Sequence, residues 1–437
     1  MCKVLDRIIL DKCSYVFDTS PYQFGFKKQH STNICTFVVN EVIQYYMNNK
    51  SQVYVSLLDA SRAFDRVEYV KLFELLLAKH ICPTVCRFLI NLYTKQLIRV
   101  KWGTHFSDPF AVKNGVKQGG VMSPLLFTVY MDELLNRLKL SHNGCHIGDR
   151  FFGAFGYADD IILLSPTLNG LKSLFSLCSN YATEYNVMFN SSKSKLIVYK
   201  NGCSENFEPN LYFMNGTISV VAHDKHLGNY IGNIHMSEII QKITDDYLTR
   251  VNMVRAHFKR TPVHVIYKLF KTYCMPLYGI QLIDLTSPSV NVFYVAWRKS
   301  IRYLLGLPRN THCALLPYIC NDSDVVNQIC VRFVKFLKSL ELSHNVLVKT
   351  CHNIIKSGSC SAVSNSLSFI VNYLNCSRHD LLSIRHVNSR IRSNDEDKAT
   401  KGSVIRDLLN MKRQSCYSDQ FLTQDEISFI IEDLCTS

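Results

Sequence analysis

The sequence predicts an α+β fold, in which a ferredoxin-like sheet with helices packed on one face is followed by a helical region. Three observations support this prediction. Residues 52–58 form a short apolar run typical of a buried strand, and two further apolar runs flank residues 158–160 as in a hairpin. From about residue 236 onward, apolar residues recur at helical spacing. Strand, helices, hairpin, helix and strand in this order are typical of one sheet covered by helices.

The composition indicates a globular protein with phosphate-rich partners. The chain has 437 residues, of which 47% are apolar and 19% charged, and its net charge is +14. This length allows two or three domains, and the cationic excess favours nucleic acid, with acidic membrane surfaces as the alternative. No uncharged apolar run of about 18 residues is available to span a bilayer. The 17 cysteines lack a repeated spacing, which indicates reduced thiols and an intracellular location, in the cytoplasm, the nucleus or both.

The first elements are helices around one strand. Residues 1–18 lack the apolar core of a signal peptide and have the pattern of an amphipathic helix, so we expect the chain to begin inside a domain. Residues 32–46 repeat apolar side chains at helical spacing. The β-branched and aromatic strand at residues 52–58 ends directly before Asp59, which places a carboxylate at its carboxyl end.

Helices continue through the next part of the chain. Residues 66–99 have a helical pattern that Pro83 interrupts. After a glycine-rich loop at residues 115–120, Ser123-Pro124 begins a helix that continues to about residue 139, because proline suits a first helical turn.

A hairpin with acidic residues at its tip follows. The apolar strands 151–157 and 161–164 are separated only by Ala158-Asp159-Asp160. Beyond the hairpin we expect a helix, a strand, two more helices and a flexible polar loop, at residues 171–185, 196–199, 240–254, 265–274 and 388–402.

Three carboxylates therefore lie where strands end. If the strand before Asp59 lies beside the hairpin that carries Asp159 and Asp160, all three meet at one edge of the sheet. Carboxylates this close repel one another and raise each other's pKa values. Divalent cations that prefer oxygen ligands relieve the repulsion, and Mg²⁺ is the ion that such sites select. Two such ions can activate an attacking hydroxyl and stabilise a leaving phosphate.

Structural interpretations remain open beside this one. An Asp-Asp pair at a turn also satisfies backbone groups there, although the apolar strands around these carboxylates favour a site. Asp65 is expected to begin a helix. Several cysteines and histidines near the C-terminus carry zinc-ligand side chains, but their spacing fits no compact zinc pattern, so we expect ordinary buried thiols. These residues are Cys351, His352, Cys360, Cys376 and His379.

The order of these motifs resembles that of the reverse transcriptases of non-LTR (LINE-like) retrotransposons, over residues 1–312. Six segments carry the resemblance: QFGFKKQHST at 23–32, LLDASRAFD at 57–65, GVKQGGVMSPLLFTVYMDEL at 115–134, FGYADDIIL at 155–163, FNSSKSKLIVY at 189–199 and KHLGNYIG at 225–232. Two later segments, LFKTYCMPLYG at 269–279 and WRKSIRYLLGLPRNTH at 297–312, resemble jockey-like elements.

The resemblance implies a role for each matched residue. Asp59, Asp159 and Asp160 match the catalytic residues that bind metal. Phe64 matches an aromatic gate that would clash with a ribose 2′-OH, and Lys193 matches a lysine near the triphosphate.

Two further pairs match binding segments of the same family. Gln118-Gly119 resembles the pair that lies against the incoming nucleotide and the template. Leu227-Gly228 matches the turn of the primer grip.

The resemblance also implies a right-hand polymerase. Its expected parts are partial fingers at 1–50, a palm with a fingers insertion and the primer grip at 51–235, a helical thumb at 236–312, and a helical C-terminal region of unknown role at 313–437. The implied activity is RNA-directed DNA polymerase, a nucleotidyltransferase that adds deoxynucleotides to a primer 3′ end by two-metal phosphoryl transfer during retrotransposon copying. The implied cofactor is Mg²⁺, with Mn²⁺ as the substitute. The implied partners are an RNA template, a DNA primer or target and deoxynucleoside triphosphates, with no membrane.

The departures from the family define the alternative. The family's earlier fingers strand, with its basic residue for the triphosphate, has no counterpart, so we expect an N-terminally truncated chain in which Lys27 and Lys28 are not assumed to substitute. The alternative function is a catalytically inactive, nucleic-acid-binding fragment of a retroelement. An RNA-templated RNA polymerase is disfavoured by Phe64.

The expected thumb carries cations that could follow a template–primer duplex through its backbone, among aromatic rings that could stack. These residues are Lys259, Arg260, Lys268, Lys271, Arg298, Lys299 and Arg302, with Tyr273, Phe293 and Trp297.

Overall fold

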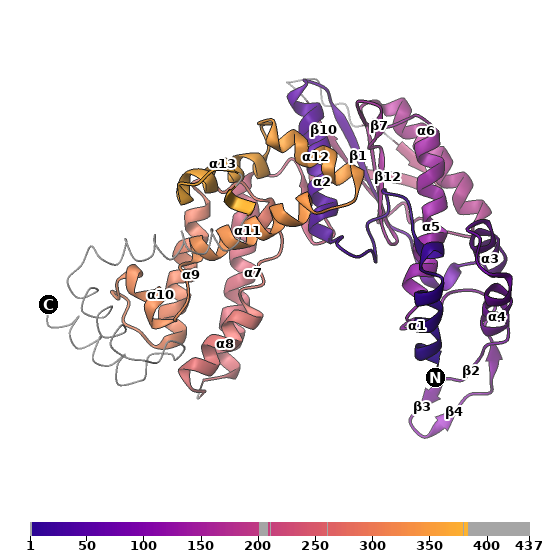
Figure 1. Cartoon of the computed structure of the whole chain (residues 1–437), viewed down its shortest axis with the longest axis horizontal. Coiled ribbons are helices and arrows are strands. Elements are labelled where there is room, and N and C mark those ends of the chain that lie inside the picture. The colour runs from indigo at the N-terminus through magenta and orange to yellow at the C-terminus, as the bar shows by residue number, and fades with distance from the viewer. Residues whose placement is uncertain (1, 201–208, 210, 260, 379, 383–437) are drawn as a thin grey trace. The chain divides into compact units, whose positions relative to one another are not determined.

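A computed structural model of the protein describes residues 2–200, 209, 211–259, 261–378 and 380–382. The chain forms two compact units (Figure 1). The first comprises Met1–Asn233 and Ser343–Cys351, and the second comprises Ile234–Leu342 and His352–Ser437. The polar segment 388–402, for which the sequence predicts a flexible loop, lies outside the described residues.

A six-stranded sheet forms the centre of the first unit. Its strand order is β11-β12-β10-β1-β9-β8, and neighbouring strands are antiparallel except β10 and β12, which are parallel. The strands are β1 (Val53–Leu58), β8 (Ala154–Tyr157), β9 (Asp160–Ser165), β10 (Lys195–Tyr199), β11 (Leu211–Phe213) and β12 (Gly216–Val220).

Strand β1 lies in the middle of this sheet because its sequence suits burial on both sides. All six of its residues are buried, and successive residues of a strand face opposite sides, so protein covers both faces of β1. Its one polar side chain, Ser56, donates a hydrogen bond to the backbone oxygen of Lys195 at 3.3 Å. The strand predicted at residues 52–58 is therefore confirmed.

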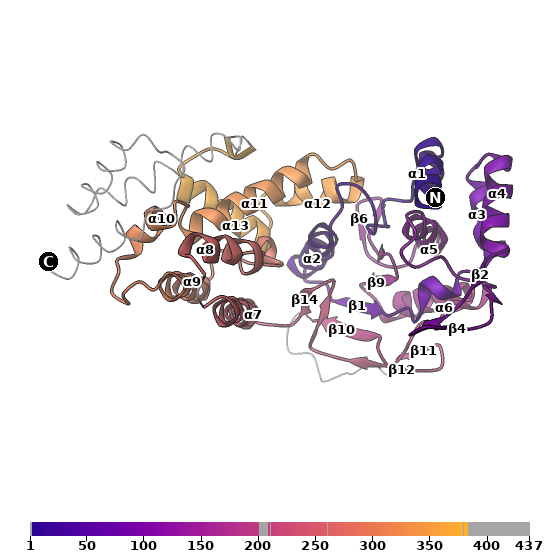
Figure 2. The ribbon, with the colours of Figure 1, turned by 90° about the horizontal axis from the view of Figure 1, so that it is seen from below.

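Six α-helices belong to the part of the first unit before residue 234. Side chains of Ser31 and Thr167 cap two of them by accepting hydrogen bonds from backbone N–H groups, and a proline lies in the first turn of two others. Helix α5 packs on β8, α6 packs on β9, and α3 and α4 lie side by side (Figure 2). The helices are α1 (Cys2–Lys12), α2 (Thr32–Asn48), α3 (Tyr69–Ala78), α4 (Pro83–Thr94), α5 (Ser123–Leu140) and α6 (Leu168–Glu184), with the 3-10 turns η1 (Ser14–Phe17) and η2 (Ala63–Arg66).

Two sequence-based expectations for this unit are wrong in part. The helical pattern of residues 66–99 ends at Thr94, and Leu97–Ile98 forms strand β2 instead. The strand expected at 151–157 is split, because its first residue belongs to β7 (Arg150–Phe151), which pairs with β6 (His146–Ile147), and only β8 joins the sheet.

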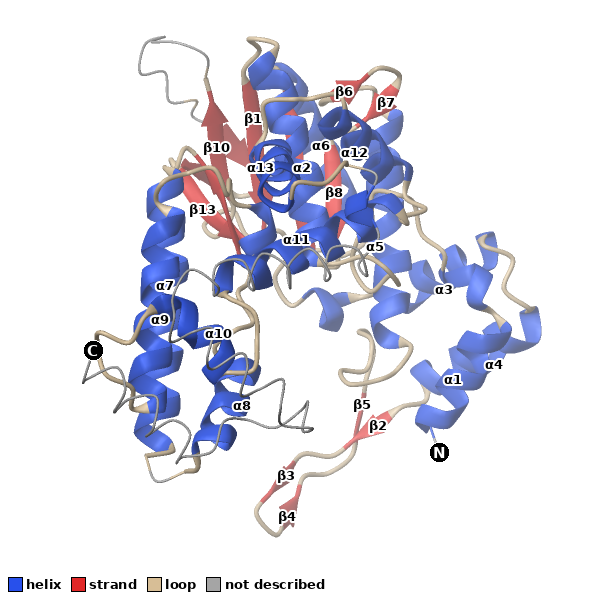
Figure 3. Cartoon of the chain, turned by 60° about the vertical axis from the view of Figure 1, so that its left-hand side comes forward, coloured by secondary structure: helices blue, strands red, loops and turns tan. Residues whose placement is uncertain are grey.

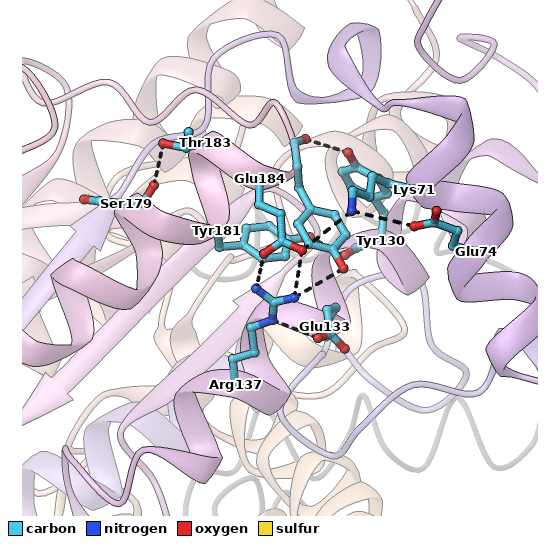
Figure 4. Close-up of polar contacts among 10 residues, drawn as sticks. Lys71, Glu74, Tyr130, Glu133, Arg137, Ser179, Tyr181, Thr183 and Glu184 are labelled. Carbon is cyan, nitrogen blue, oxygen red and sulfur yellow. Dashed lines mark hydrogen bonds and ion pairs between the residues drawn. The ribbon is translucent and has the colours of Figure 1, made fainter.

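A polar network connects three helices of the first unit (Figure 4). The Arg137 guanidinium in α5 contacts Glu184 of α6 at 2.6 and 3.3 Å and Glu133 at 2.8 Å. Lys71 of α3 lies 3.7 Å from the same Glu184 carboxylate. The Tyr181 hydroxyl donates to the backbone oxygen of Tyr130. Because one guanidinium joins two carboxylates in a fixed geometry, the network holds α5 and α6 in register behind the sheet.

Replacing Arg137 by Met is expected to lower the free energy of unfolding by about 1 kcal/mol, because the side chain is partly exposed and its ion pairs are partly screened. Thermal unfolding followed by circular dichroism measures this change. The matched control is Arg87→Met, an exposed position on α4, which should leave the melting temperature unchanged. Equal melting temperatures for both variants would contradict a structural role for the network.

Short two-stranded hairpins complete the first unit. One, formed by β13 (His223–His226) and β14 (Asn229–Gly232), is anchored to the main sheet because Asn233 Nδ2 donates to the Val198 backbone oxygen at 2.9 Å. A second, longer ribbon joins α4 to α5. Its strands are β2 (Leu97–Ile98), β3 (Lys101–Trp102), β4 (His105–Phe106) and β5 (Phe110–Ala111).

Within the described residues the second unit contains helices and no strand (Figure 3). Tyr247, Phe270 and Phe293 meet edge to face in its core, where Trp297 is also fully buried. Helix α12 begins in the first unit and ends in the second. The elements are α7 (Met236–His257), α8 (Val263–Tyr273), η3 (Ile280–Leu282), α9 (Val290–Leu305), η4 (Cys313–Leu315), α10 (Leu316–Ile319), α11 (Val325–Glu341), α12 (Val346–Lys356), α13 (Ala362–Leu374) and η5 (Asp380–Leu382).

The basic and aromatic surface expected in this unit is wrong in part. Phe293 and Trp297 are core residues and cannot stack on a ligand, whereas Tyr273 is exposed. Lys271 pairs with Asp322 at 2.7 Å and Arg298 with Asp324 at 3.1 Å, so acids of the same unit neutralise both cations.

The remaining cations of that surface divide into two groups. Arg302 donates to the Thr311 backbone oxygen, while Lys259, Lys268 and Lys299 are exposed. Arg260 lies outside the described residues. Among the described residues, no helix combines the length and the apolar character needed to cross a membrane.

Candidate active site

The sheet register brings Asp59 beside Asp160. Strands β1 and β9 pair antiparallel with Leu58 opposite Ile161, so the next pair outward is Asp59 and Asp160. Asp59 is the first residue after β1, and Asp160 is the first residue of β9. Both carboxylates therefore lie at the same edge of the sheet, as the sequence predicts.

Asp159 lies next to them in a tight turn. Tyr157 pairs with Asp160, which leaves Ala158 and Asp159 as the two residues of the turn. Ala158 has φ +60°, and Asp159 is not among the residues with positive φ, a combination typical of a type II′ hairpin turn. Alanine in this region costs about 1–2 kcal/mol, so surrounding structure must hold the turn in place.

Gln23 supplies that support. Its side-chain oxygen accepts hydrogen bonds from the Ala158 N–H at 3.0 Å and the Gly25 N–H at 2.9 Å. Gln23 is fully buried and bridges in parallel to Gly156, where the Phe24 N–H donates to the Gly156 oxygen at 2.7 Å. The segment around Gln23 thus extends the sheet beyond β8 and fastens the turn that carries Asp159.

Gly25 allows this close approach. A Cβ atom at Gly25 would lie 2.4 Å from the Ala158 backbone nitrogen, a distance that no side chain tolerates. The family resemblance covers residues 23–32 but assigns no role to Gln23 or Gly25. The available signal was a glutamine set between aromatic residues, which does not reveal its partner.

The other side of the site is closed by the loop after α6. The Asn190 N–H donates to the Asp59 backbone oxygen at 2.9 Å, and the Asp59 N–H donates to Ser194 Oγ at 3.2 Å. Lys193 Nζ lies 3.9 Å from Asp59 Oδ2; the Lys193 side chain is exposed and the Asp59 side chain is partly buried. The loop therefore brings one cation to the edge where the carboxylates gather.

The carboxylates lie in an environment that disfavours their charge. Burial, followed by the negative charges of Asp159 and Asp59, raises the pKa of Asp160 to about 6. Burial and the charge of Asp59 likewise raise the pKa of Asp159. A cation placed between these groups would favour their ionised forms and lower both pKa values.

The donor set fits a hard divalent cation. All three side chains offer oxygen, and their joint charge is the feature that such ions neutralise. Within the part of the chain that the structure describes, no three His, Cys, Asp or Glu side chains already converge as a metal site. Lys193 Nζ lies 3.9 Å from one Asp59 carboxylate oxygen, so a divalent ion at this site would compete with the Lys193 ammonium for Asp59.

The C-terminal cysteines and histidines differ in their burial. Cys351 and His352 are buried, Cys360 is exposed, and His379 lies outside the described residues. Burial, followed by the charge of Lys356, lowers the pKa of His352 to about 4. The described cysteines between Cys13 and Cys376 are free thiols.

Phe64 has one face packed and is half-buried. Its ring stacks on the buried Phe127 with centroids 4.4 Å apart, and its backbone oxygen accepts from the Val116 N–H at 2.8 Å. These contacts fix the ring in one position near the strand end that carries Asp59.

Gln118 and Gly119 follow on the loop held by Phe64. Gln118 Nε2 donates to Asp65 Oδ1 at 3.2 Å, so Asp65 orients the Gln118 side chain. Asp65 itself lies in the first turn of the 3-10 helix η2, close to the helix start expected for it. Gly119 has φ +77°, and open space surrounds the position that a Cβ would occupy. The backbone at Gly119 can therefore be approached closely by a ligand.

Leu227 and Gly228 form the turn between β13 and β14. Their φ values of +49° and +79° are typical of a type I′ turn, and a leucine at positive φ is strained. Asn229 Nδ2 donates to Thr36 Oγ1 at 3.1 Å, which holds the turn against the start of α2. On the same helix, burial and the charge of Asp160 raise the pKa of Cys35. The first turns of α2 thus border both this hairpin and the carboxylates.

Lys27 does not face the site. Its ammonium donates to the backbone oxygens of Thr19 and Ser20 at 2.7 and 2.6 Å, and burial lowers its pKa. Lys28 is exposed.

The part of the chain that carries the site motifs matches a known protein family. The sequence profile of the family described as "Reverse transcriptase (RNA-dependent DNA polymerase)" matches residues 1–260, which include every residue of the candidate site.

Individual relatives are polymerases of mobile elements. The chain is 25% identical over 193 residues to the Retrovirus-related Pol polyprotein from the type-2 retrotransposable element R2DM of Drosophila melanogaster, covering 44% of this chain and 18% of that protein. It is 24% identical over 325 residues to the RNA-directed DNA polymerase from the mobile element jockey of the same species, covering 70% of this chain and 34% of that protein. The chain thus spans only part of the length of these relatives.

The solved structures that align with this chain include telomerases. A truncated apo telomerase from Candida tropicalis aligns with a TM-score of 0.37 and 16% identity over 53% of this chain and 45% of its own. A Candida albicans telomerase in complex with a fragment of telomeric RNA aligns with a TM-score of 0.40 and 12% identity over 85% and 56% of the two chains. These values are too low to carry an argument, so the family rests on the sequence match. The chain belongs to the reverse transcriptase family, and the relatives that it resembles are polymerases of retrotransposable elements.

Proposed function

We propose that this chain is an RNA-directed DNA polymerase that extends a DNA primer on an RNA template with deoxynucleoside triphosphates. The observation that carries the proposal is the placement of Asp59 opposite Asp160, with Asp159 in the adjoining turn, in a chain of the reverse transcriptase family. Retrotransposon copying, inside the cell, is the process that such a polymerase serves.

A right-hand polymerase fold of mixed helices and sheets agrees with the family. Its finer division, into partial fingers at 1–50, palm at 51–235, thumb at 236–312 and a helical C-terminal region at 313–437, is part of the proposal. The strand order β10-β1-β9-β8, all antiparallel, supports a ferredoxin-like palm, because it is the fourth, first, third and second strand of a βαββαβ unit.

Asp59, Asp159 and Asp160 would hold the divalent ions, two Mg²⁺ or in their place Mn²⁺. Bound there, the ions supply charge stabilisation for the attacking primer oxygen and for the pyrophosphate that leaves. The three carboxylates would determine where the positive charge of the ions lies. The buried Gln23 holds the turn that positions Asp159. Lys193 offers a mobile positive charge to the triphosphate once Asp59 no longer engages it.

Two further groups select and orient the nucleotide. The ring of Phe64, fixed against Phe127, would exclude a ribose 2′-OH. Gln118 and the open backbone at Gly119 would lie against the incoming base and the template. Leu227 and Gly228, in their strained turn, would grip the primer end.

Primer extension tests the proposal. The chain is incubated with oligo(dT) annealed to poly(rA), labelled dTTP and Mg²⁺, with a parallel reaction in EDTA. Extension that requires Mg²⁺ is the expected result. Duplex binding without any extension, in Mg²⁺ and in Mn²⁺, would instead favour the alternative of an inactive nucleic-acid-binding fragment, which the partial coverage of the relatives keeps in view.

Replacing Phe64 by Val is expected to raise the use of ribonucleotides relative to deoxynucleotides at least about tenfold, since about 1.4 kcal/mol of steric exclusion would be lost. Incorporation of rUTP and dTTP on poly(rA) measures the ratio. Phe64→Tyr keeps the bulk and is the control that should preserve discrimination. An unchanged ratio in Phe64→Val would remove Phe64 from the role of gate.

A further inference from the structure

The ribbon between α4 and α5 leaves the body of the first unit. Residues 97–111, called here the exposed ribbon, are all exposed, and the ribbon extends away from the sheet (Figures 1 and 3). Leu97 and Ile98 pair with Ala111 and Phe110 near its base, and Lys101 and Trp102 pair with Phe106 and His105 at its tip. Because every residue of the ribbon is exposed, no hydrophobic core stabilises its strands. An isolated two-stranded ribbon of this kind is only marginally stable in water.

The exposed ribbon carries large apolar side chains that are open to solvent. Trp102 is 84% exposed, Phe106 61% and Phe110 50%, and Leu97 and Val100 are also exposed. Such a concentration on one protruding element is typical of a binding surface. Cross-strand pairing places Lys101 beside Phe106 on one face and Trp102 beside His105 on the other, so each face of the tip has a ring next to a nitrogen-bearing side chain.

The charge of the segment identifies the chemistry of the partner. Between residues 95 and 117 the sole acid is Asp108, against the cations Lys95, Arg99, Lys101, Lys113 and Lys117. Lys101 Nζ lies 5.6 Å from the centre of the Phe106 ring. Cations attract phosphates, and exposed rings stack on bases that are not already stacked in a duplex.

We propose that the exposed ribbon binds a single-stranded stretch of nucleic acid, with Trp102 and Phe106 stacking on bases and with Arg99 and Lys101 contacting phosphates. This inference deepens the proposed function and rests on it for the identity of the strand, which would be the unpaired template ahead of the growing duplex.

The base of the ribbon is connected to the candidate active site. The Val112 N–H donates to the Gln96 oxygen at 3.1 Å, which closes the base. The next residues attach to the end of η2, the 3-10 turn that contains Phe64, because the Gly115 N–H donates to the Val67 oxygen at 2.8 Å. Gln118 follows three residues later. The loop that follows the ribbon therefore leads directly into the candidate active site, so a nucleic acid strand bound by the ribbon would lie near that site.

The test compares the full chain with the double variant Trp102→Ala/Phe106→Ala. Fluorescence anisotropy measures binding to a primer–template with an RNA overhang, to the same with a DNA overhang, and to a blunt duplex. Loss of two stacking rings is expected to weaken binding of an overhang at least about tenfold and to leave blunt-duplex binding within about twofold. The matched control is Tyr212→Ala, an exposed aromatic residue on edge strand β11, which should bind every substrate like the unmodified chain.

Tryptophan fluorescence gives a second readout. The chain has two tryptophans, and since Trp297 is fully buried, quenching on addition of single-stranded RNA reports Trp102. For charge, Arg99→Gln/Lys101→Gln should flatten the slope of log affinity against log salt by about 1.4, the value for two phosphate contacts on a single strand. Because all these side chains are exposed, the melting temperature should not change.

The outcomes separate this inference from the proposed function. A chain that extends primers while the double variant binds overhangs as tightly as the unmodified chain would overturn the ribbon's role alone. A chain that never extends primers, but loses overhang binding in the double variant, would support the ribbon site and overturn the polymerase. Greater loss with the RNA overhang assigns the site to template, and equal loss assigns it to any single strand. A change in oligomeric state by sedimentation, with overhang binding intact, would overturn the inference in favour of a protein partner.

Discussion

Replacing Asp159 by Asn is expected to reduce primer extension by at least about a thousandfold, which corresponds to about 4 kcal/mol of transition-state stabilisation. The substitution keeps the size of the side chain and removes one of the three charges that the site uses to hold divalent ions. Burial and the charge of Asp59 already disfavour the ionised form of Asp159, so its charge is maintained by the cation it would bind. Single-turnover incorporation of one dTMP measures the effect.

The control for this experiment is a carboxylate outside the site. Asp149→Asn alters an exposed residue in the turn between β6 and β7, and should leave incorporation unchanged. Binding of the primer–template duplex should be retained in both variants, because it depends on shape and basic residues. Normal incorporation by Asp159→Asn would show that these carboxylates are turn residues only.

Replacing Gln23 by Met is expected to lower kcat about 10- to 100-fold, with the KM for dTTP and duplex affinity within about threefold of the unmodified values. Methionine fills the same space but accepts no strong hydrogen bond, so the Ala158 and Gly25 N–H groups lose their acceptor. Without it, the strained φ of Ala158 can relax and move Asp159 from its position. Gln23 is a positioning residue, and steady-state kinetics separate its effect on kcat from binding.

A purely structural role for Gln23 would give a different result. Gln23 Nε2 is buried without a partner among the described residues, so methionine also removes an unsatisfied donor and the melting temperature should change little. The matched control is Ser56→Ala, which removes a buried hydrogen bond from the same sheet without touching the turn. Ser56→Ala should lower stability by about 1 kcal/mol with kcat intact. Equal kcat values for both variants would rule out a positioning role for Gln23.

The local elements of the site could be predicted because their sequence patterns are strong. An uninterrupted β-branched and aromatic run before Asp59 suits a strand buried on both faces, and β1 is such a strand. Two apolar runs around a short acidic turn allow little besides a hairpin, and the register then places Asp159 and Asp160 at its tip. The motif order supplied the family, which the sequence match confirmed.

Other elements could not be predicted because their local signals were ambiguous or their partners were distant. The helical pattern of 66–99 has no breaker after Thr94, yet residues 97–111 form the exposed ribbon, since short apolar runs fit a strand as well as a helix. The sequence places Phe293 and Trp297 beside cations, which suggested rings that stack on nucleic acid, but both rings pack in the core of the second unit.

The sequence by itself therefore determined the strands, the helices and the acidic residues at their ends, because backbone propensity and apolar periodicity act within a few residues. Tertiary structure decided which distant groups support them. Gln23 accepts from a turn 135 residues away, and Lys193 faces Asp59 across the sheet edge. Such contacts depend on how strands are paired and not on any local pattern, since a hydrogen bond needs only its two partners to be brought within about 3 Å.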